Sequence, residues 1–145
     1  MIGREAAASL LARALSGAYE WKGFDAANIG ALHDAAIDHG VAAVLWDALD
    51  GEVRGPAPAL RALLEPGVRA ALTRDLFTGR DIQAVVAALD GAGVPMLITK
   101  GTALAYTTYP QPWLRPRTDT DILVRPDDVD GLVAHERRLR SALDE

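Results

Sequence analysis

The stretch that decides the fold is VPMLITKGTALAYTTYPQPWLRPRTDTDILVR, residues 94–125. It predicts a strand, a sharp turn at Lys100-Gly101, a short helix, an irregular connection broken by prolines, and a second strand that opens with Asp119-Thr120-Asp121. Side chains on a strand alternate between its two faces, so Asp119 and Asp121 are expected to point the same way, about 6 to 7 Å apart along the strand. Two carboxylates would then face one place.

A positive charge between these two carboxylates would offset their repulsion, which otherwise raises the pKa of each. Mg²⁺ is the expected occupant, because it prefers oxygen ligands and is commonly held by one or two carboxylates together with substrate phosphates. Lys100-Gly101-Thr102 suits the phosphate end, since Gly101 lets the backbone approach closely. The start of the following helix offers free N–H groups to an anion. The sequence therefore predicts a nucleoside triphosphate bound through metal.

Residues around these two features follow a fixed order: Lys100-Gly101, Ala103-Leu104, Tyr109-Pro110, Arg115-Pro116, Asp119 to Val124, and Arg125 to Asp128. This order resembles a family of uncharacterised nucleotidyltransferases, whose pattern runs LKG-x-A-L, Y-P, R-P and D-I-D-L-L-V-R-P-E-D. The family belongs to the DNA polymerase β-like superfamily, whose members transfer a nucleotidyl group by two-metal catalysis.

The resemblance implies a fold, a reaction and a set of site residues. The fold would be α/β (α+β), with a nucleotidyltransferase-type core around a small mixed sheet. The reaction would move an NMP from an NTP such as ATP to an acceptor, with release of pyrophosphate. Asp119 and Asp121 would hold two Mg²⁺ ions, or Mn²⁺ in their place. The phosphates would be contacted by Lys100, Gly101, Thr102 and Arg115.

The chain departs from the pattern at several positions. Thr99 stands where the family usually has an aliphatic residue, and Thr120 replaces the usual Ile. The superfamily generally uses a third carboxylate on a later strand, and the sequence ends at Glu145 before such a strand, so we expect a C-terminal truncation. An alternative therefore stays open: a non-catalytic module that binds nucleotide or a partner without turnover.

Other interpretations of the acidic pair are less consistent with its surroundings. Haloacid-dehalogenase-like phosphatases and metal-dependent glycosyltransferases place a D-x-D pair at the end of an apolar strand, whereas here the apolar residues 122–124 follow the pair.

Arg115 and Arg117 could form salt bridges with the aspartates instead of binding phosphate. Tyr109 and Trp113 could cover a base, although anchoring the loop to the core is the preferred interpretation. A helical interaction domain with an incidental D-x-D is the remaining rival.

Composition bounds the class of protein. The chain has 145 residues, of which 50% are hydrophobic, and its mean hydropathy is +0.07, which predicts one globular domain. It contains no cysteine, no apolar run long enough to span a bilayer and no signal-peptide pattern, so we expect a cytoplasmic location. The net charge of −5 and the pI near 5.1 argue against broad nonspecific binding to nucleic acid.

Helical periodicity dominates before residue 91. Helices are predicted over about 4–15, 26–39 with Asp25 as N-cap, 41–49, a short turn at 59–64, and a long helix from Pro66 to about residue 90. Asp127-Asp128 should open a last helix. Residues 1–90 would form a helical N-terminal region and residues 91–145 the N-terminal part of the nucleotidyltransferase core, as one structural unit. Two strands are marginal alone, so either the long helix covers them, or a further segment, a second copy in a homo-oligomer, or a partner should complete the sheet.

Overall fold

The computed structural model describes residues 3–17, 26–129 and 131–133. Three short helices come first: α1 (Arg4–Leu15), α2 (Ala26–Asp38) and α3 (Ala42–Ala48). The predicted helices in these regions are thus confirmed. Gly17 and Gly40 have φ of +68° and +66°, the left-handed conformation that follows a helix end and that glycine adopts without steric cost. The predicted N-cap Asp25 lies outside the described residues.

These helices pack together with the start of the fourth around a leucine-rich core. Leu32, Leu45, Leu60 and Leu64 are fully buried there, with Leu11 beside them. Burying one such side chain stabilises the fold by about 1.5–3 kcal/mol relative to leaving it exposed. The N-terminal region therefore has a hydrophobic core of its own, which supports the first turns of α4.

The fourth helix, α4 (Ala57–Gly91), is continuous over 35 residues, and Pro66 lies inside it. The prediction of a separate short helix at 59–64 and a new helix starting at Pro66 is therefore wrong. Proline lacks the N–H that would bond to the preceding turn, at a cost of about 3 kcal/mol or more. Leu64 and Val68 flank the proline and are both buried, so their packing holds the helix together through this position.

Two antiparallel strands form the sheet: β1 (Met96–Thr99) and β2 (Asp121–Val124). Helix α5 (Lys100–Thr107) and the 3-10 helix η1 (Pro112–Leu114) lie between them in sequence. The α+β class is confirmed, but within the described residues the sheet is purely antiparallel and not mixed. The paired Leu97 and Leu123 are 61% and 58% exposed. Completion of the sheet by a further strand or a partner stays a prediction.

β2 begins at Asp121, two residues later than predicted. The register pairs Asp121 with Thr99, the last residue of β1. Because the chain turns into α5 at Lys100, Thr120 and Asp119 have no residue of β1 opposite them. Asp119 therefore precedes the ladder, and the expected common face for the two aspartates stays a prediction.

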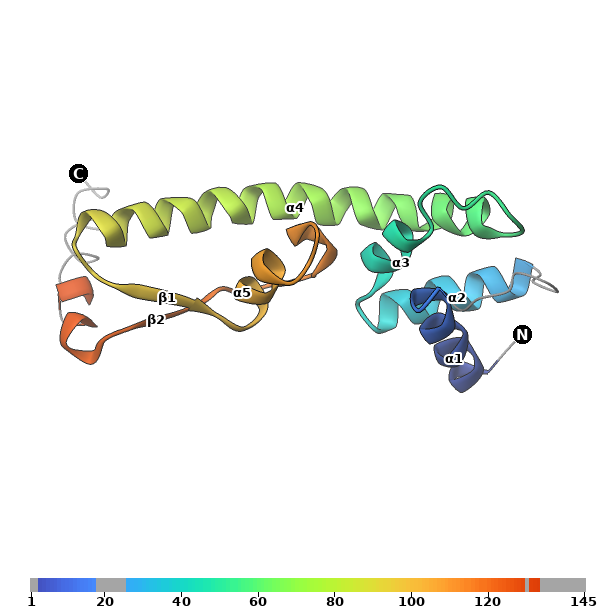
Figure 1. Ribbon diagram of the computed structural model, residues 1–145, viewed down its shortest axis with the longest axis horizontal. Helices are drawn as coiled ribbons and strands as arrows, with labels where there is room; N and C mark the ends of the chain where they lie inside the picture. The colour runs from blue at the N-terminus through green and yellow to red at the C-terminus, as the bar shows by residue number, and fades with distance from the viewer. Residues whose placement is uncertain (1–2, 18–25, 130, 134–145) are drawn as a thin grey trace, which may run out of the picture.

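Helix α4 connects the two halves of the molecule (Figure 1). The helical cluster lies under its N-terminal end, and the sheet with α5 lies along its C-terminal part. A second small core joins them, in which buried Ala43, Val68 and Leu114 are packed with Trp46, Tyr109 and Trp113. The rings of Trp46 and Trp113 meet edge to face at 6.1 Å, so anchoring of the Pro-rich connection to the core is confirmed. The division into regions 1–90 and 91–145 stays a prediction.

The last described segment is helical at residues 126–129 and 131–133, as predicted from Asp127-Asp128. The backbone N–H of Asp128 donates to the carbonyl of Arg125, and the two side chains form an ion pair of 3.1 Å. No helix among the described residues is long and apolar enough to cross a membrane.

Candidate functional site

Lys100 stands at the junction of β1 and α5 in a left-handed backbone conformation, with φ of +51°. It is the sole non-glycine residue with positive φ within the described ranges. A left-handed conformation crowds the Cβ of an L-residue, and residues held this way gather at functional sites. The sharp turn predicted at Lys100-Gly101 is thus present, and Lys100 is its left-handed residue, since Gly101 is not among the glycines with positive φ. The turn therefore falls on the residue that carries the ammonium group.

The Lys100 ammonium lies beside the acidic pair. Its Nζ donates to Asp121 Oδ1 at 2.9 Å. The pKa of Lys100 is raised, first by this hydrogen bond, then by the charge of Asp121 and to a smaller extent by that of Asp119. The ammonium is thus paired with Asp121, and the charge of Asp119 acts on it more weakly. The Lys100 side chain is 74% exposed and that of Asp121 is 34% exposed, so the ammonium has room to move.

Thr102 fixes the segment that leads into β2. Its side chain is almost fully buried, at 1% exposure, and its hydroxyl lies 3.0 Å from the Thr120 hydroxyl and 3.3 Å from the Asp119 carbonyl oxygen. These bonds replace the ladder that Thr120 lacks. The hydroxyl of Thr102 is therefore used within the fold, and the predicted phosphate contact of this residue stays a prediction.

Arg115 lies on the other side of the turn. Its Nε donates to the Gly101 carbonyl at 3.3 Å, and its guanidinium is 5.9 Å from the centre of the Tyr109 ring. A Cβ built on Gly101 would lie 3.9 Å from Arg115 Nε and Nη2, which is ordinary contact distance. The alternative in which Arg115 pairs with an aspartate is not what the structure shows, since the bond is to a backbone oxygen. Arg115 therefore lies next to the predicted phosphate turn.

Arg117 has a different partner from the one considered in the sequence. Its Nη2 lies 2.5 Å from Asp75 Oδ1 on α4, in an ion pair with side-chain exposures of only 5% and 15%. The same guanidinium donates to the Pro112 carbonyl at 3.1 Å, and its carbon lies 5.3 Å from the centre of the Tyr106 ring. The segment just before Asp119 is thus tied to the long helix.

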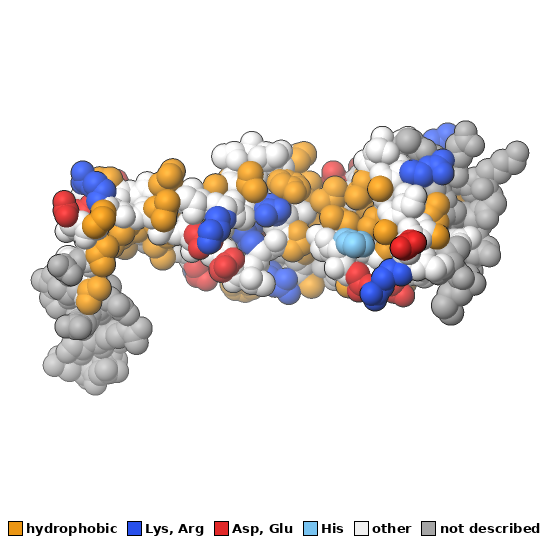
Figure 2. Space-filling view, turned by 90° about the horizontal axis from the view of Figure 1, so that it is seen from below, with side chains coloured by type: hydrophobic (Ala, Val, Ile, Leu, Met, Phe, Trp, Pro, Cys, Tyr) orange, Lys and Arg blue, Asp and Glu red, His pale blue; other side chains and the backbone are white. Residues whose placement is uncertain are grey.

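The structure brings the predicted site residues into one neighbourhood. Lys100, Gly101 and Thr102 begin α5, and Arg115 contacts Gly101. Asp121 pairs with Lys100, and the carbonyl of Asp119 accepts from Thr102. Figure 2 shows acidic and basic side chains gathered midway along one face, with hydrophobic side chains on both sides of them.

Sequence reasoning missed Asp75. The sequence offers one signal for it, a carboxylate next to Leu76 on a mostly apolar helix. Its partner Arg117 is 42 residues away, so the pairing is not visible in the sequence. Among the described residues no group of three or more His, Cys, Asp or Glu side chains could together hold a metal ion, so a third carboxylate is not found there.

A comparison with known families finds a match. The model of a family described as uncharacterised nucleotidyltransferase matches residues 25–135, which is most of the chain. Comparisons with curated proteins and with solved structures find no significant match.

Proposed function

The chain belongs to the uncharacterised nucleotidyltransferase family, and on this premise we propose that it moves a nucleoside monophosphate from an NTP to an acceptor. The observation that carries the proposal is the left-handed Lys100, whose ammonium pairs with Asp121 at 2.9 Å where β1 turns into α5. It supports a polyphosphate site because a cation, a helix start and two carboxylates meet there.

The donor atoms suit a divalent cation. Asp119 and Asp121 would hold Mg²⁺ or Mn²⁺, since both supply the hard carboxylate oxygens that these ions prefer. The ion pair with Lys100 supports this fit, because Asp121 already attracts a positive charge. When bound, the metal would stabilise the charge on the attacking and leaving oxygens.

The residues of the turn would bind the triphosphate. Lys100 would exchange Asp121 for the β- and γ-phosphates as the nucleotide enters, which its exposed side chain permits. Backbone N–H groups of Gly101 and Thr102 lie in the first turn of α5, where an anion is favoured. Arg115 keeps its Nη1 and Nη2 groups for phosphate while its Nε holds the Gly101 carbonyl.

The proposed reaction is a displacement at the α-phosphorus of the NTP. An acceptor oxygen forms a bond to the α-phosphorus, and the bond from that phosphorus to the bridging oxygen of the β-phosphate breaks. Pyrophosphate leaves with the electron pair, and the acceptor proton passes to solvent. Lys100 and Arg115 offset the charge that accumulates on the leaving group. Protein, sugar, antibiotic, small-molecule and RNA acceptors are all compatible with this step.

A second function is favoured by one specific observation. The described residues contain no third carboxylate that could join the acidic pair at a metal site. A non-catalytic module that binds NTP and metal without transfer would need only the features that are present.

Two measurements separate these possibilities. Thermal unfolding with each NTP, with and without Mg²⁺, tests binding, and transfer of label from an α-labelled NTP tests catalysis. Asp119→Asn should abolish transfer, whereas Asp81→Asn, an exposed carboxylate on α4, is the matched control and should not. Binding without transfer would favour the non-catalytic module. Absence of any Mg²⁺-dependent stabilisation by an NTP would overturn both.

A further inference from the structure

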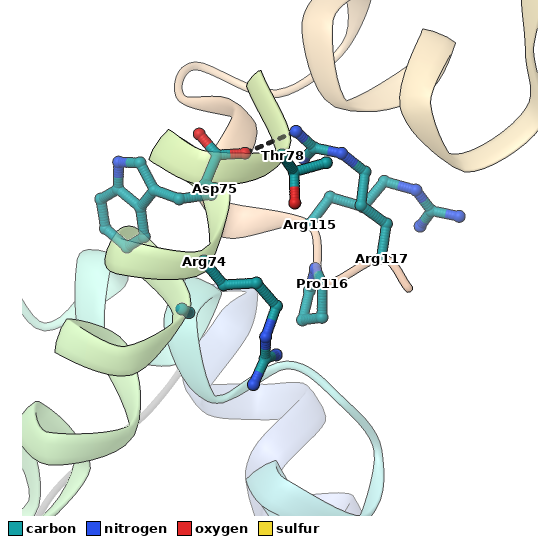
Figure 3. Close-up of a pocket in the computed structure, with 8 residues that line it drawn as sticks. Arg74, Asp75, Thr78, Arg115, Pro116 and Arg117 are labelled. Atoms are coloured by element: carbon teal, nitrogen blue, oxygen red, sulfur yellow. Dashed lines mark hydrogen bonds and ion pairs between the residues drawn. The ribbon is translucent and has the colours of Figure 1, made fainter. Parts of the chain in front are cut away.

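A small hollow opens between α4 and the segment that follows η1. Its volume is about 20 Å³, and Arg74, Thr78, Trp113, Pro116 and Arg117 are among the residues that line it. That volume holds a single water-sized atom. Figure 3 shows the Asp75–Arg117 pair at one side of the hollow, with Arg74 extending from α4 alongside Pro116.

One polar atom of a residue that lines this hollow has no hydrogen-bond partner. The Nε atom of Arg117 is buried and makes no hydrogen bond, although the other two nitrogens of the guanidinium bond to Asp75 and Pro112. A buried donor without a partner costs about 1–3 kcal/mol, more when it is charged. An acceptor atom in the hollow would remove this penalty.

Two further donors line the hollow without partners among the described residues. Arg74 is exposed and forms no hydrogen bond or ion pair there, and the half-buried hydroxyl of Thr78 makes no hydrogen bond. Arg115 also lines it, whereas Asp75 is the sole carboxylate in the lining and is already paired with Arg117. The hollow is therefore electropositive and rich in free donors.

We propose that this hollow is the binding site for a single anionic group, a carboxylate or a phosphate. One oxygen of the group fills the hollow and accepts from Arg117 Nε and Thr78 Oγ1, while Arg74 pairs with the remaining oxygens at the mouth. Because Arg115 lines the hollow and also contacts Gly101, the site adjoins the nucleotide turn. If the proposed nucleotidyl transfer holds, the anionic group belongs to the acceptor.

The test uses the full chain, without metal or NTP, so that it does not depend on nucleotidyl transfer. Sodium acetate and sodium phosphate are titrated at constant ionic strength, and the NMR signal of the Arg117 Nε–H group is followed. The signal should shift and saturate with at least one of the two anions, and the tighter of them identifies a carboxylate or a phosphate site. A signal unmoved by either anion would mean that water alone fills the hollow, which would overturn the proposal.

Variants locate the anion. Arg74→Gln and Thr78→Val should each weaken binding about tenfold, the loss of one hydrogen bond to a charged group. Arg80 is an exposed arginine on the same helix, and Arg80→Gln should leave anion binding unchanged. Equal weakening by this control would mean that the net charge of the protein, and not the hollow, binds the anion. Thr78→Val keeps the side-chain shape and serves if Arg74→Gln impairs folding.

Lys100→Gln distinguishes the hollow from the nucleotide turn. In this variant anion binding should be unchanged, whereas the thermal stabilisation by NTP should be lost. Loss of anion binding would place the anion at the nucleotide turn and refute a separate site. If the wild-type chain shows no nucleotidyl transfer, the anionic group does not belong to an acceptor, but the anion site itself is unaffected.

Discussion

Removal of the Asp75 carboxylate should destabilise the protein more than removal of any exposed carboxylate. Asp75 and Arg117 have side-chain exposures of 15% and 5%, and their nearest atoms are 2.5 Å apart. Asp75→Asn keeps the shape of the side chain but removes its charge, which leaves a buried guanidinium uncompensated. The free energy of unfolding should fall by about 3–5 kcal/mol, the cost of breaking a buried pair by removing one partner.

An exposed pair provides the matched control. Glu65 and Arg69 pair at 2.7 Å on the same helix, with side-chain exposures of 44% and 78%. Glu65→Gln should therefore change the free energy of unfolding by no more than about 1 kcal/mol. Because both variants replace a carboxylate by an amide on α4, the difference between them isolates the effect of burial.

Urea and thermal unfolding measure both variants. At about 2–4 °C for each kcal/mol in a chain of this size, Asp75→Asn should lower Tm by roughly 6–20 °C. The double variant Asp75→Leu with Arg117→Met should recover most of that loss, since an apolar pair needs no counter-charge. A Tm for Asp75→Asn equal to that of Glu65→Gln would refute the conclusion that the pair is buried.

Three further predictions follow from local geometry. Lys100→Gly should be more stable to urea than Lys100→Ala, because glycine adopts the φ of +51° without a crowded Cβ; equal stability would contradict the left-handed turn. Arg54 lowers the pKa of Glu52 from 4.5 to about 2 through a side-chain hydrogen bond. The stabilisation of the fold by this pair is therefore present above pH 4.5 and lost as the pH falls toward 2. NMR titration of Glu52 should give the lowered pKa, and Arg54→Gln should return it toward 4.5. Thr102→Val should cost about 1–2 kcal/mol in urea unfolding because it leaves the Thr120 hydroxyl unpaired, whereas Thr102→Ser should cost less.

The parts of the fold that depend on local chemistry could be predicted from sequence. Gly17 and Gly40 end the first two helices because a left-handed residue after a helix favours glycine, and this preference is visible in one residue. Pro66 shows the limit of the same reasoning. Proline favours a helix start, but buried neighbours outweigh the lost hydrogen bond, and burial cannot be read from a single residue.

The site could be predicted in part for a related reason. Lys100 and the acidic pair stand out because their residue types and order are unusual, so their proximity was expected. The turn at Lys100-Gly101 was predicted, but sequence does not say which of its two residues adopts the positive φ, because the preference of glycine for that conformation is strong but not compulsory, and Lys100 adopts it. Asp75 could not be found, since its pairing with Arg117 depends on how α4 crosses the Pro-rich connection.

This missed pair changes how the site is understood. Arg117 lies two residues before Asp119, and its guanidinium is held by α4 and by the Pro112 carbonyl. Helix α4 in turn is fixed by Leu60 and Leu64 in the core of the helical region. The core of the helical region thus fixes α4, and α4 in turn fixes the backbone segment that precedes the acidic pair. The helical region therefore does more than precede the strands, because without it the residues before Asp119 would lose the partner that orders them.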